Sequence, residues 1–183
     1  MARLPYLNQA DLAPENKDLL NRVINVTRVL VHNPDAARAF HTVGNYIRFK
    51  SKLDPRLREL AILEVGWLTR SPFEWSHHVK LGMDFGVTKD DIQGLIADAA
   101  GQPNDLDPLT RLVLRAAREI TENLGPSDAV FAELQQHFPN DELIDLVLST
   151  AFYCAVVRVL ATFQVDVEPE YQPYMDMFPF PAD

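Results

Sequence analysis

The sequence has little cysteine and no apolar leader, and both absences narrow its class. Cys154 is the single cysteine among 183 residues, so no intrachain disulfide can form. The first residues, MARLPYLNQADLAPENKD, contain no apolar stretch of the length that a signal peptide requires. From these two absences, the default expectation is a cytoplasmic protein.

Long uncharged apolar runs and alternating patterns are also missing. A membrane-spanning helix needs an uncharged run of about 18 residues. The nearest candidate, residues 143–167, contains Asp145 and Arg158, so no membrane partner is expected. No period-two alternation of strand length, no repeat and no low-complexity tract is present. We therefore predict an all-α protein.

The balance of charge disfavours one class of partner. The formal net charge is −9, and no basic stripe offsets it, so we expect no nucleic-acid partner. Anionic small molecules are not excluded, because a local pocket can be basic on an acidic protein. We expect a small-molecule substrate.

Helical periodicity, capping residues and proline breaks divide the chain into about eight predicted helices. The length of 183 residues and the hydrophobic fraction of 47% fit a single domain over residues 1–183 with a sizeable core. The last helix is apolar on nearly every face, so we expect it to be central or at a subunit interface, and to be capped by Asn140 or Asp141. The predicted helices cover about 14–31, 36–49, 55–70, 73–84, 90–100, 108–123, a short segment ending near 138, and 140–165.

The C-terminal residues, about 168–183, differ from the rest of the chain. They contain four prolines among aromatic residues, which predicts an extended segment rather than a helix. The aromatic side chains would pack on the body or on a neighbouring subunit; a frayed end is the alternative. These side chains belong to Tyr171, Tyr174, Phe178 and Phe180.

One short segment carries candidate chemistry. Glu74 and His78 are four residues apart in a predicted helix, so they lie on the same face and can share a proton. A carboxylate beside an imidazole is common in general acid–base catalysis near neutral pH. The alternative is a solvated ion pair on the surface, with no function. From the residues alone, Glu59 on the preceding helix is a first-turn carboxylate that could pair with Arg56 or Arg58.

The other histidines and the metal-like spacings are weaker indications of a functional site. Glu74-x-x-His77 has the spacing of di-iron bundles, but the second motif that such a site needs is missing, so we expect no metal and no cofactor. We expect His32 and His41 to be structural, because they flank a helix junction, and His137 to be at the surface. Three aromatic residues near the candidate pair are expected in the core or at an interface rather than against a substrate: Trp67, Phe73 and Trp75.

Several segments together resemble the carboxymuconolactone decarboxylase family, which includes the alkylhydroperoxidase-like proteins. The most specific is Glu-Trp-Ser-His-His at residues 74–78; the others are His-Asn-Pro at 32–34, Leu-Arg-Glu-Leu-Ala-Ile-Leu at 57–63, and the closing helix followed by Val-Glu-Pro at 167–169. The resemblance covers most of the chain. It implies a single-domain helical bundle and, for partners, trimers or hexamers of this chain.

The peroxidase branch of that family has Cys-x-x-Cys-x-x-x-His, with a relay glutamate one helix earlier. The resemblance puts Ser71 and Glu74 at the two cysteine positions, His78 at the histidine and Glu59 at the relay glutamate. Disulfide-based peroxidase chemistry requires two thiols within exchange distance, and both are missing. Cys154 lies in an apolar run, where we expect a buried and inert side chain.

The remaining Glu74-x-x-x-His78 is similar to the decarboxylase branch, which implies a cofactor-independent lyase of aromatic catabolism. That reaction removes CO₂ from a carboxylated unsaturated lactone. By this resemblance His78 would donate and accept the proton, Glu74 would fix its tautomer, Glu59 would be a second carboxylate, and His77 a reserve candidate. The chain is longer than the decarboxylase at both ends and keeps Glu59, so the substrate is not inherited. A ring opening, dehydration or isomerisation, or a non-catalytic member that binds a ligand or partner, are the alternatives.

Overall fold

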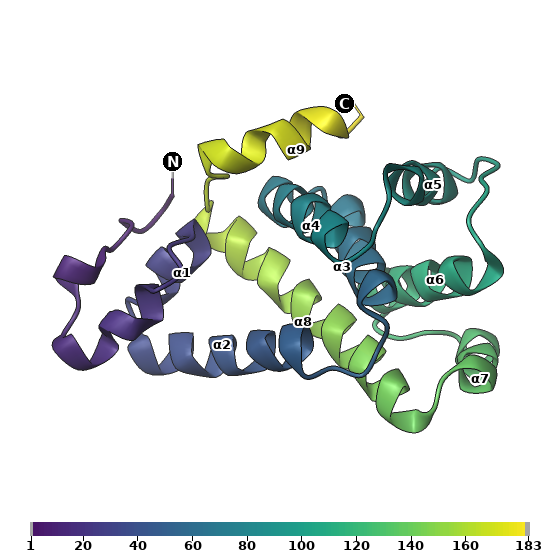
Figure 1. The fold of residues 1–183 in the computed structure, drawn as a ribbon, viewed down its shortest axis with the longest axis horizontal. Helices are drawn as coiled ribbons and strands as arrows, with labels where there is room; N and C mark the ends of the chain where they lie inside the picture. The colour runs from purple at the N-terminus through teal and green to yellow at the C-terminus, as the bar shows by residue number, and fades with distance from the viewer. Residues whose placement is uncertain (1, 182–183) are drawn as a thin grey trace.

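The computed structural model describes residues 2–181, and every regular element in that range is helical (Figure 1). The predicted all-α, single-domain bundle is therefore confirmed. After a short 3₁₀ helix at Gln9–Asp11, the helices are η2 (Pro14–Leu20), α1 (Asn25–Leu30), α2 (Pro34–Phe49), α3 (Pro55–Leu68), α4 (Pro72–Asp84), α5 (Lys89–Ala99), α6 (Pro108–Asn123), α7 (Asp128–His137), α8 (Asn140–Phe163), η3 (Pro169–Tyr171) and α9 (Gln172–Met177).

Helix α3 is central to the bundle, with α4, α6 and α8 packed against it. Its residues from Leu57 to Gly66 are all buried, as expected for a helix surrounded by others. Two glycines allow α3 and α4 to approach closely. A Cβ atom at Gly66 would lie 3.3 Å from the backbone nitrogen of Trp75, and one at Gly82 would lie 3.6 Å from Cβ of Glu59. This packing brings Glu59 on α3 next to α4.

Helix starts follow the local signals in the sequence. Asp54 accepts a hydrogen bond from Leu57 N–H at 3.0 Å, and Thr88 and Asp91 form a capping box at the start of α5. Proline occupies the first turn of α2, α3, α4 and α6, where its missing N–H costs nothing. The long helix is an exception, because Pro139 precedes it and gives no side-chain cap, so the prediction that Asn140 or Asp141 caps it is wrong.

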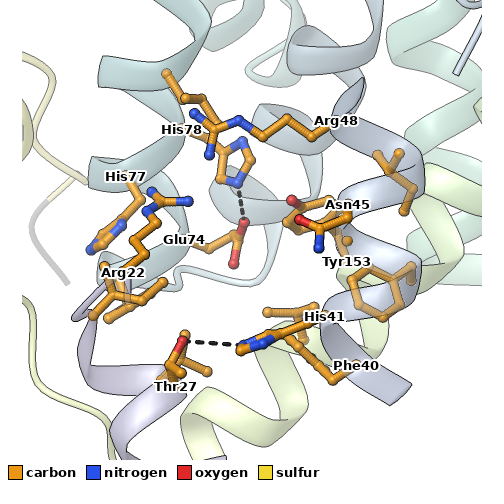
Figure 2. Close-up of a pocket in the computed structure, with 18 of the residues that line it drawn as sticks. Arg22, Thr27, Phe40, His41, Asn45, Arg48, Glu74, His77, His78 and Tyr153 are labelled. Atoms are coloured by element: carbon orange, nitrogen blue, oxygen red, sulfur yellow. Dashed lines mark hydrogen bonds and ion pairs between the residues drawn. The ribbon is translucent and has the colours of Figure 1, made fainter. Parts of the chain in front are cut away.

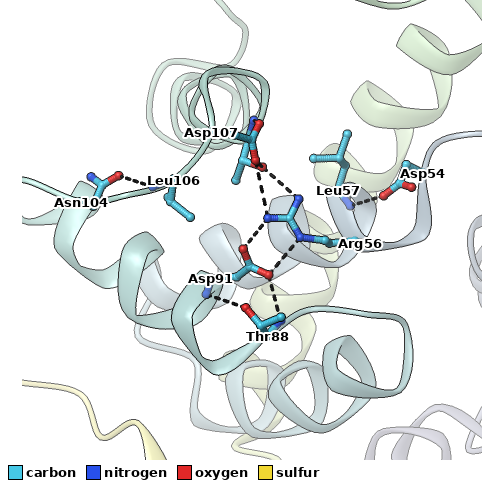
Figure 3. A network of polar contacts seen from close by, with 9 residues as sticks. Asp54, Arg56, Leu57, Thr88, Asp91, Asn104, Leu106 and Asp107 are labelled. Atoms are coloured by element: carbon cyan, nitrogen blue, oxygen red, sulfur yellow. Dashed lines mark hydrogen bonds and ion pairs between the residues drawn. The ribbon is translucent and has the colours of Figure 1, made fainter.

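A polar network ties the first turns of α3, α5 and α6 together (Figure 3). Arg56 Nε donates to Asp91 Oδ2 at 2.9 Å, and a second guanidinium nitrogen also contacts that carboxylate. Arg56 also donates to Thr110 Oγ1 at 3.1 Å and lies 3.7 Å from Asp107 Oδ2. The network anchors the end of α3 that carries Glu59.

Helix α8 is long and apolar enough to cross a membrane by length and composition alone, and it is the one such helix among the described residues. Core helices of globular bundles meet the same criterion, and 44% of its most apolar stretch is buried inside the structure. It packs on α2, α3, α6 and α7. Part of its remaining surface is apolar, since Ile144 is 63% exposed and Leu148 is 36% exposed.

The helix predicted over 14–31 is wrong, because the structure divides it into η2 and α1. The backbone at Ile24 is extended (φ −126°, ψ 151°), which separates the two. The first turn of α1 is capped from far away: Asn25 N–H donates to Glu168 Oε1 at 2.5 Å. A contact across 143 residues leaves no local signal in the sequence.

The C-terminal residues are helical rather than extended, and this corrects a second prediction. Pro169 and Pro173 occupy the first turns of η3 and α9, where proline is tolerated. The expected packing of the aromatic side chains on the body is confirmed, and the frayed-end alternative is wrong for residues up to 181. Trp75 Nε1 donates to the Phe178 carbonyl at 2.8 Å, and the Phe180 ring packs on Trp67. Residues 182 and 183 lie outside the described range.

Candidate active site

The structure brings Glu59, Glu74 and His78 together between α3 and α4. His78 Nδ1 lies 2.7 Å from Glu59 Oε2, and His78 Nε2 lies 2.9 Å from Glu74 Oε1. Glu59 is 1% exposed, Glu74 is 2% exposed and His78 is 6% exposed. The alternative of a solvated surface pair is therefore wrong for this dyad.

The two carboxylates contact His78 in different ways. The contact between Nδ1 and Glu59 has the geometry of a hydrogen bond. At the other nitrogen, Glu74 Oε1 is close to Nε2 but, among the described residues, accepts no well-aligned hydrogen bond although it is buried. When the His78 imidazole is protonated, its Nε2–H bond therefore does not point directly at the Glu74 carboxylate.

Buried charges set the protonation of His78. Burial alone would lower the pKa of His78, but the neighbouring Glu74 and Glu59 carboxylates outweigh it and raise the pKa to about 9. Burial would raise the pKa of Glu59, yet His78 and Arg58 together lower it. Arg58 Nη2 donates to Glu59 Oε1 at 3.0 Å. At neutral pH the imidazole is therefore a cation held between carboxylates, and Glu59 pairs with Arg58 as well as with His78.

His77 is held separately, by the C-terminal part of the chain. Its Nε2 lies 2.7 Å from Glu168 Oε2, and its ring is stacked between Phe73, at 4.0 Å, and Tyr171, at 3.5 Å. Burial lowers the pKa of His77 more than the Glu168 carboxylate raises it. His77, the reserve candidate for carrying the proton, is therefore neutral at neutral pH and is held in place by these contacts.

A cavity of about 320 Å³ lies against these side chains, between α4, α2, α8 and the segment around α1 (Figure 2). Glu59, Glu74, His77 and His78 all line it. Phe73, Phe40, Phe152 and Tyr153 contribute aromatic wall, and Thr27 Oγ1 lies 3.4 Å from His41 Nε2 on the opposite side. A mostly apolar cavity with a few convergent polar groups is typical of a small-molecule site.

The cavity lining includes residues that were not predicted from the sequence. The Tyr153 ring meets the His78 ring edge-on at 4.8 Å, and burial followed by the Glu74 and Glu59 charges raises the pKa of its hydroxyl. Arg22, Asn45 and Arg48 also line the cavity. They lie on other helices or connections, so no local pattern could have linked them to Glu74 and His78.

Several expectations about single residues can be compared with the structure. His41 was expected to be structural, but it also lines the cavity. His32 behaves as a structural residue, since its Nε2 atom lies 2.9 Å from the Pro5 carbonyl oxygen. His137 is exposed, as expected. Trp67 and Trp75 belong to the core.

Two further side chains differ from expectation. Phe73 lines the cavity instead of serving only as core. Cys154 is partly exposed rather than fully buried, and its Sγ atom lies 3.6 Å from Thr121 Oγ1. Within residues 2–181, no group of three or more His, Cys, Asp or Glu side chains is placed to hold a metal ion.

Comparison with known proteins links the middle of the chain to a family. Residues 34–119 match the carboxymuconolactone decarboxylase family, a range that contains Glu59, Glu74 and His78 but not the closing helix. Among curated proteins, none matches the chain. Residues 34–119 of this chain are therefore similar to the carboxymuconolactone decarboxylase family.

Solved structures share the fold over nearly the whole chain. An uncharacterized peroxidase-related protein from Ralstonia eutropha JMP134, described as an alkylhydroperoxidase AhpD core, is 21% identical, with 95% of each chain covered and a TM-score of 0.76. A cysteine-to-alanine variant of the debrominase Bmp8, bound to 2,3,4-tribromopyrrole, is 16% identical, with 96% of this chain and 98% of that chain covered and a TM-score of 0.78. At these identities the likeness establishes an alkylhydroperoxidase-like fold.

Proposed function

We propose that this protein is an enzyme, a cofactor-independent lyase that removes CO₂ from a small unsaturated carboxylated compound such as a lactone. The observation that carries the proposal is the His78 imidazole, cationic at neutral pH, held between Glu59 and Glu74 on the wall of a cavity. The match of residues 34–119 to the carboxymuconolactone decarboxylase family supports the same reaction class.

The chemistry requires one proton and one electron acceptor. The bond between the carboxylate carbon and the ring breaks, and its electron pair moves into the conjugated carbonyl of the substrate to give a dienolate and CO₂. His78 then transfers its Nε2 proton to a carbon of the dienolate, and the neutral imidazole takes a proton back from water. Proton transfer of this kind contributes roughly 10²- to 10⁴-fold to rate.

Each residue of the trio has a distinct part. We assign the transferable proton to Nε2, because Nδ1 is engaged by Glu59 at 2.7 Å. Glu59 thus fixes the ring orientation, a part that the sequence assigned to Glu74. Glu74 raises the pKa of His78 and keeps the donor charged. Tyr153, whose phenol stays neutral, can donate a hydrogen bond to the developing enolate oxygen in this low-dielectric cavity.

Thiol peroxidase chemistry is not part of the proposal. The positions of the two thiols are occupied by Ser71 and Glu74, and Cys154 belongs to α8, outside the cavity lining. The Bmp8 complex contains a small planar ring, 2,3,4-tribromopyrrole, in a protein of the same fold. That supports a small unsaturated ring as the substrate class here.

Turnover of carboxylated muconolactones and related lactones, followed by CO₂ release, tests the proposal. Wild type, His78→Gln and Glu74→Gln are compared with His137→Gln, a matched control on the exposed end of α7. The proposal expects activity in wild type and in the control and a large loss in the other two. No CO₂ release from any such lactone by the folded protein would favour a non-catalytic ligand-binding member or another acid–base reaction.

We also propose that the chain forms a homo-oligomer. Exposed apolar side chains on α8, Ile144 and Leu148, support this, together with Phe49 at the end of the adjacent α2, which is 69% exposed. Family resemblance favours a trimer or hexamer. Light scattering that gives a monomer mass at all concentrations would contradict it.

A further inference from the structure

One carboxylate outside the acid–base trio joins two elements that line the cavity. Glu168, which follows α8, is 7% exposed, and its two oxygens have different partners. Oε1 accepts a hydrogen bond from Asn25 N–H at 2.5 Å, and Oε2 lies 2.7 Å from His77 Nε2. Asn25 begins α1, and Thr27 on that helix lines the cavity. His77 on α4 directly precedes His78 and lines the cavity as well (Figure 2). One side chain therefore holds α1 beside the helix of the proton donor.

The start of α1 has no local cap. The residue before it, Ile24, provides no side-chain cap, and the helix has six residues, too few to be stable alone. Asn25 is buried, so its N–H would be a donor without an acceptor if Glu168 were removed. Asn25 Nδ2 also donates to the Asp166 carbonyl at 3.0 Å. The position of the α1 wall thus depends on the segment after α8.

The two contacts of Glu168 also fix the tautomer of His77. Burial would raise the pKa of Glu168, but the hydrogen bonds with His77 and with Asn25 N–H lower it, so the carboxylate is ionised and can only accept. The His77 imidazole, whose pKa burial lowers, is neutral at neutral pH and has one N–H. That proton therefore lies on Nε2, the nitrogen beside Oε2, and Nδ1 keeps its lone pair.

Aromatic rings restrain the same imidazole from both sides. Phe73 and Tyr171 stack on the His77 ring, each with an angle of 14° between the ring planes. Tyr171 belongs to η3, which begins directly after Glu168. Stacking restricts the tilt of the imidazole but allows it to turn over about its Cβ–Cγ bond, a torsion with two broad minima. The hydrogen bond to Glu168 removes that remaining freedom.

We propose that Glu168 is a positioning residue of the candidate active site. It holds the Nε2–H tautomer of His77 and the first N–H of α1 with one carboxylate, and so keeps the α1 wall of the cavity against α4. Glu168 lies outside the cavity lining, so it acts through the two residues that it holds. Its influence on turnover rests on the proposed lyase function, whereas its hold on the cavity wall does not.

The variant Glu168→Gln tests the tautomer. A glutamine has one acceptor oxygen and one NH₂ donor, whereas both groups that contact Glu168 are donors. The backbone N–H of Asn25 cannot change its role, so the oxygen stays with it and the NH₂ group faces His77 Nε2. The imidazole can accept from that group only after its proton moves to Nδ1. NMR of the imidazole nitrogens should therefore show His77 protonated on Nε2 in wild type and on Nδ1 in Glu168→Gln, with the signal assigned by its loss in His77→Gln.

The variant Glu168→Ala tests the cavity wall, because it removes both contacts. Exchange of Asn25 N–H with deuterated water should accelerate roughly 10- to 100-fold, the factor that corresponds to the loss of a hydrogen bond to a charged group. Trypsin should also cut faster after Arg22, an exposed residue in the connection before α1. Glu170→Gln, at an exposed position of η3, is the matched control and should behave like wild type in both assays.

Either of two results would overturn the positioning role. One is the same His77 tautomer in wild type and Glu168→Gln, and the other is unchanged exchange of Asn25 N–H in folded Glu168→Ala. Circular dichroism and the melting temperature of each variant establish that it is folded. Glu168→Gln keeps the volume of the side chain and one acceptor, so it provides the test by itself if Glu168→Ala does not fold.

Turnover then separates the positioning role from the lyase function. On a lactone that releases CO₂, Glu168→Ala should raise KM roughly 10-fold, because a displaced α1 wall holds the substrate less precisely. The alkaline limb near pH 9, which belongs to His78, should stay in place. An unchanged KM would reject the positioning role and leave the lyase in place. A switched tautomer and faster Asn25 exchange, without turnover of any lactone, would retain the hold on the cavity wall and reject the lyase.

Discussion

His77 and His78 are consecutive residues on α4, and their surroundings shift the pKa values of their imidazoles in opposite directions. His77 contacts one carboxylate, Glu168, and burial prevails there. His78 contacts two carboxylates, and their charges prevail over burial. Two adjacent histidines are thereby separated into a neutral side chain and a cationic one at neutral pH, and the cation is the group that can donate a proton.

The first prediction concerns the pH dependence of kcat/KM. The His78 pKa of about 9 keeps the donor protonated through neutral pH, so activity should fall on the alkaline side near pH 9 rather than near the usual histidine value of 6.5. Glu74→Gln should move that alkaline limb to lower pH, because it removes the Glu74 charge, the larger of the two that raise the pKa of His78. Initial rates across the pH range measure both. An alkaline limb unchanged by Glu74→Gln would show that another group controls it.

The second prediction separates the two histidines by their variants. His78→Gln should lower kcat roughly 10²- to 10⁴-fold, because the proton donor is removed. His77→Gln should lower the free energy of unfolding by about 1–3 kcal/mol, because Glu168 would lose its imidazole partner, with a smaller loss of kcat. Denaturant titration and steady-state kinetics on both variants measure the two effects. The reverse pattern would assign the proton to His77.

The third prediction concerns a buried carboxylate away from the site. Glu64 on α3 pairs with Arg118 at 2.7 Å, yet burial prevails and raises its pKa to about 7. The folded protein therefore holds this proton more tightly than the unfolded chain, whose glutamate has the ordinary value of 4.5. The stability contributed by that proton is present in full below the unfolded value and is lost as pH rises through about 7.

Glu64→Gln should remove this part of the pH dependence. The melting temperature of the variant minus that of wild type should increase as the pH rises from about 5 to about 8. Glu133→Gln, on an exposed part of α7, serves as the matched control and should keep a constant difference from wild type. A constant difference for Glu64→Gln as well would contradict the expectation.

The fourth prediction concerns the close approach of α3 and α4. In Gly66→Ala the added Cβ would meet the Trp75 backbone nitrogen at 3.3 Å, which is tighter than ordinary contact and involves backbone. The helices must separate slightly, so both the melting temperature and kcat should fall, since Glu59 and His78 lie on the two helices. Gly125→Ala, where a Cβ meets nothing within 4 Å, is the control. Full activity in Gly66→Ala would mean that the site tolerates the shift.

Local signals predicted much of the fold. Asp54-Pro55, Thr88 and Asp107-Pro108 mark the starts of α3, α5 and α6, because a cap and a first-turn proline act within one turn of helix. The spacing of Glu74 and His78 placed them on one face for the same reason. The assignment of Glu59 came from the family resemblance, and the structure places it 2.7 Å from His78.

The parts that were not predicted depend on contacts between distant segments. Glu168 caps α1 and binds His77 across 91 residues, so neither the break before Asn25 nor the clamp on His77 has a local pattern. The same holds for Arg48 and Tyr153, which reach the cavity only when α2 and α8 pack beside α4. In the C-terminal segment, the prolines predict an extended chain, but first-turn positions of a helix accept proline, and two of them occupy such positions.

The clamp on His77 also sets an order of events during synthesis. Glu168 and Tyr171 follow α8 in the chain, and the Phe178 carbonyl that holds Trp75 comes later still. On the ribosome, α3 and α4 emerge long before these partners, so one face of the acid–base helix stays uncovered until the segment after α8 has been synthesised. The nascent protein should therefore remain inactive until residues 168–178 have left the ribosome.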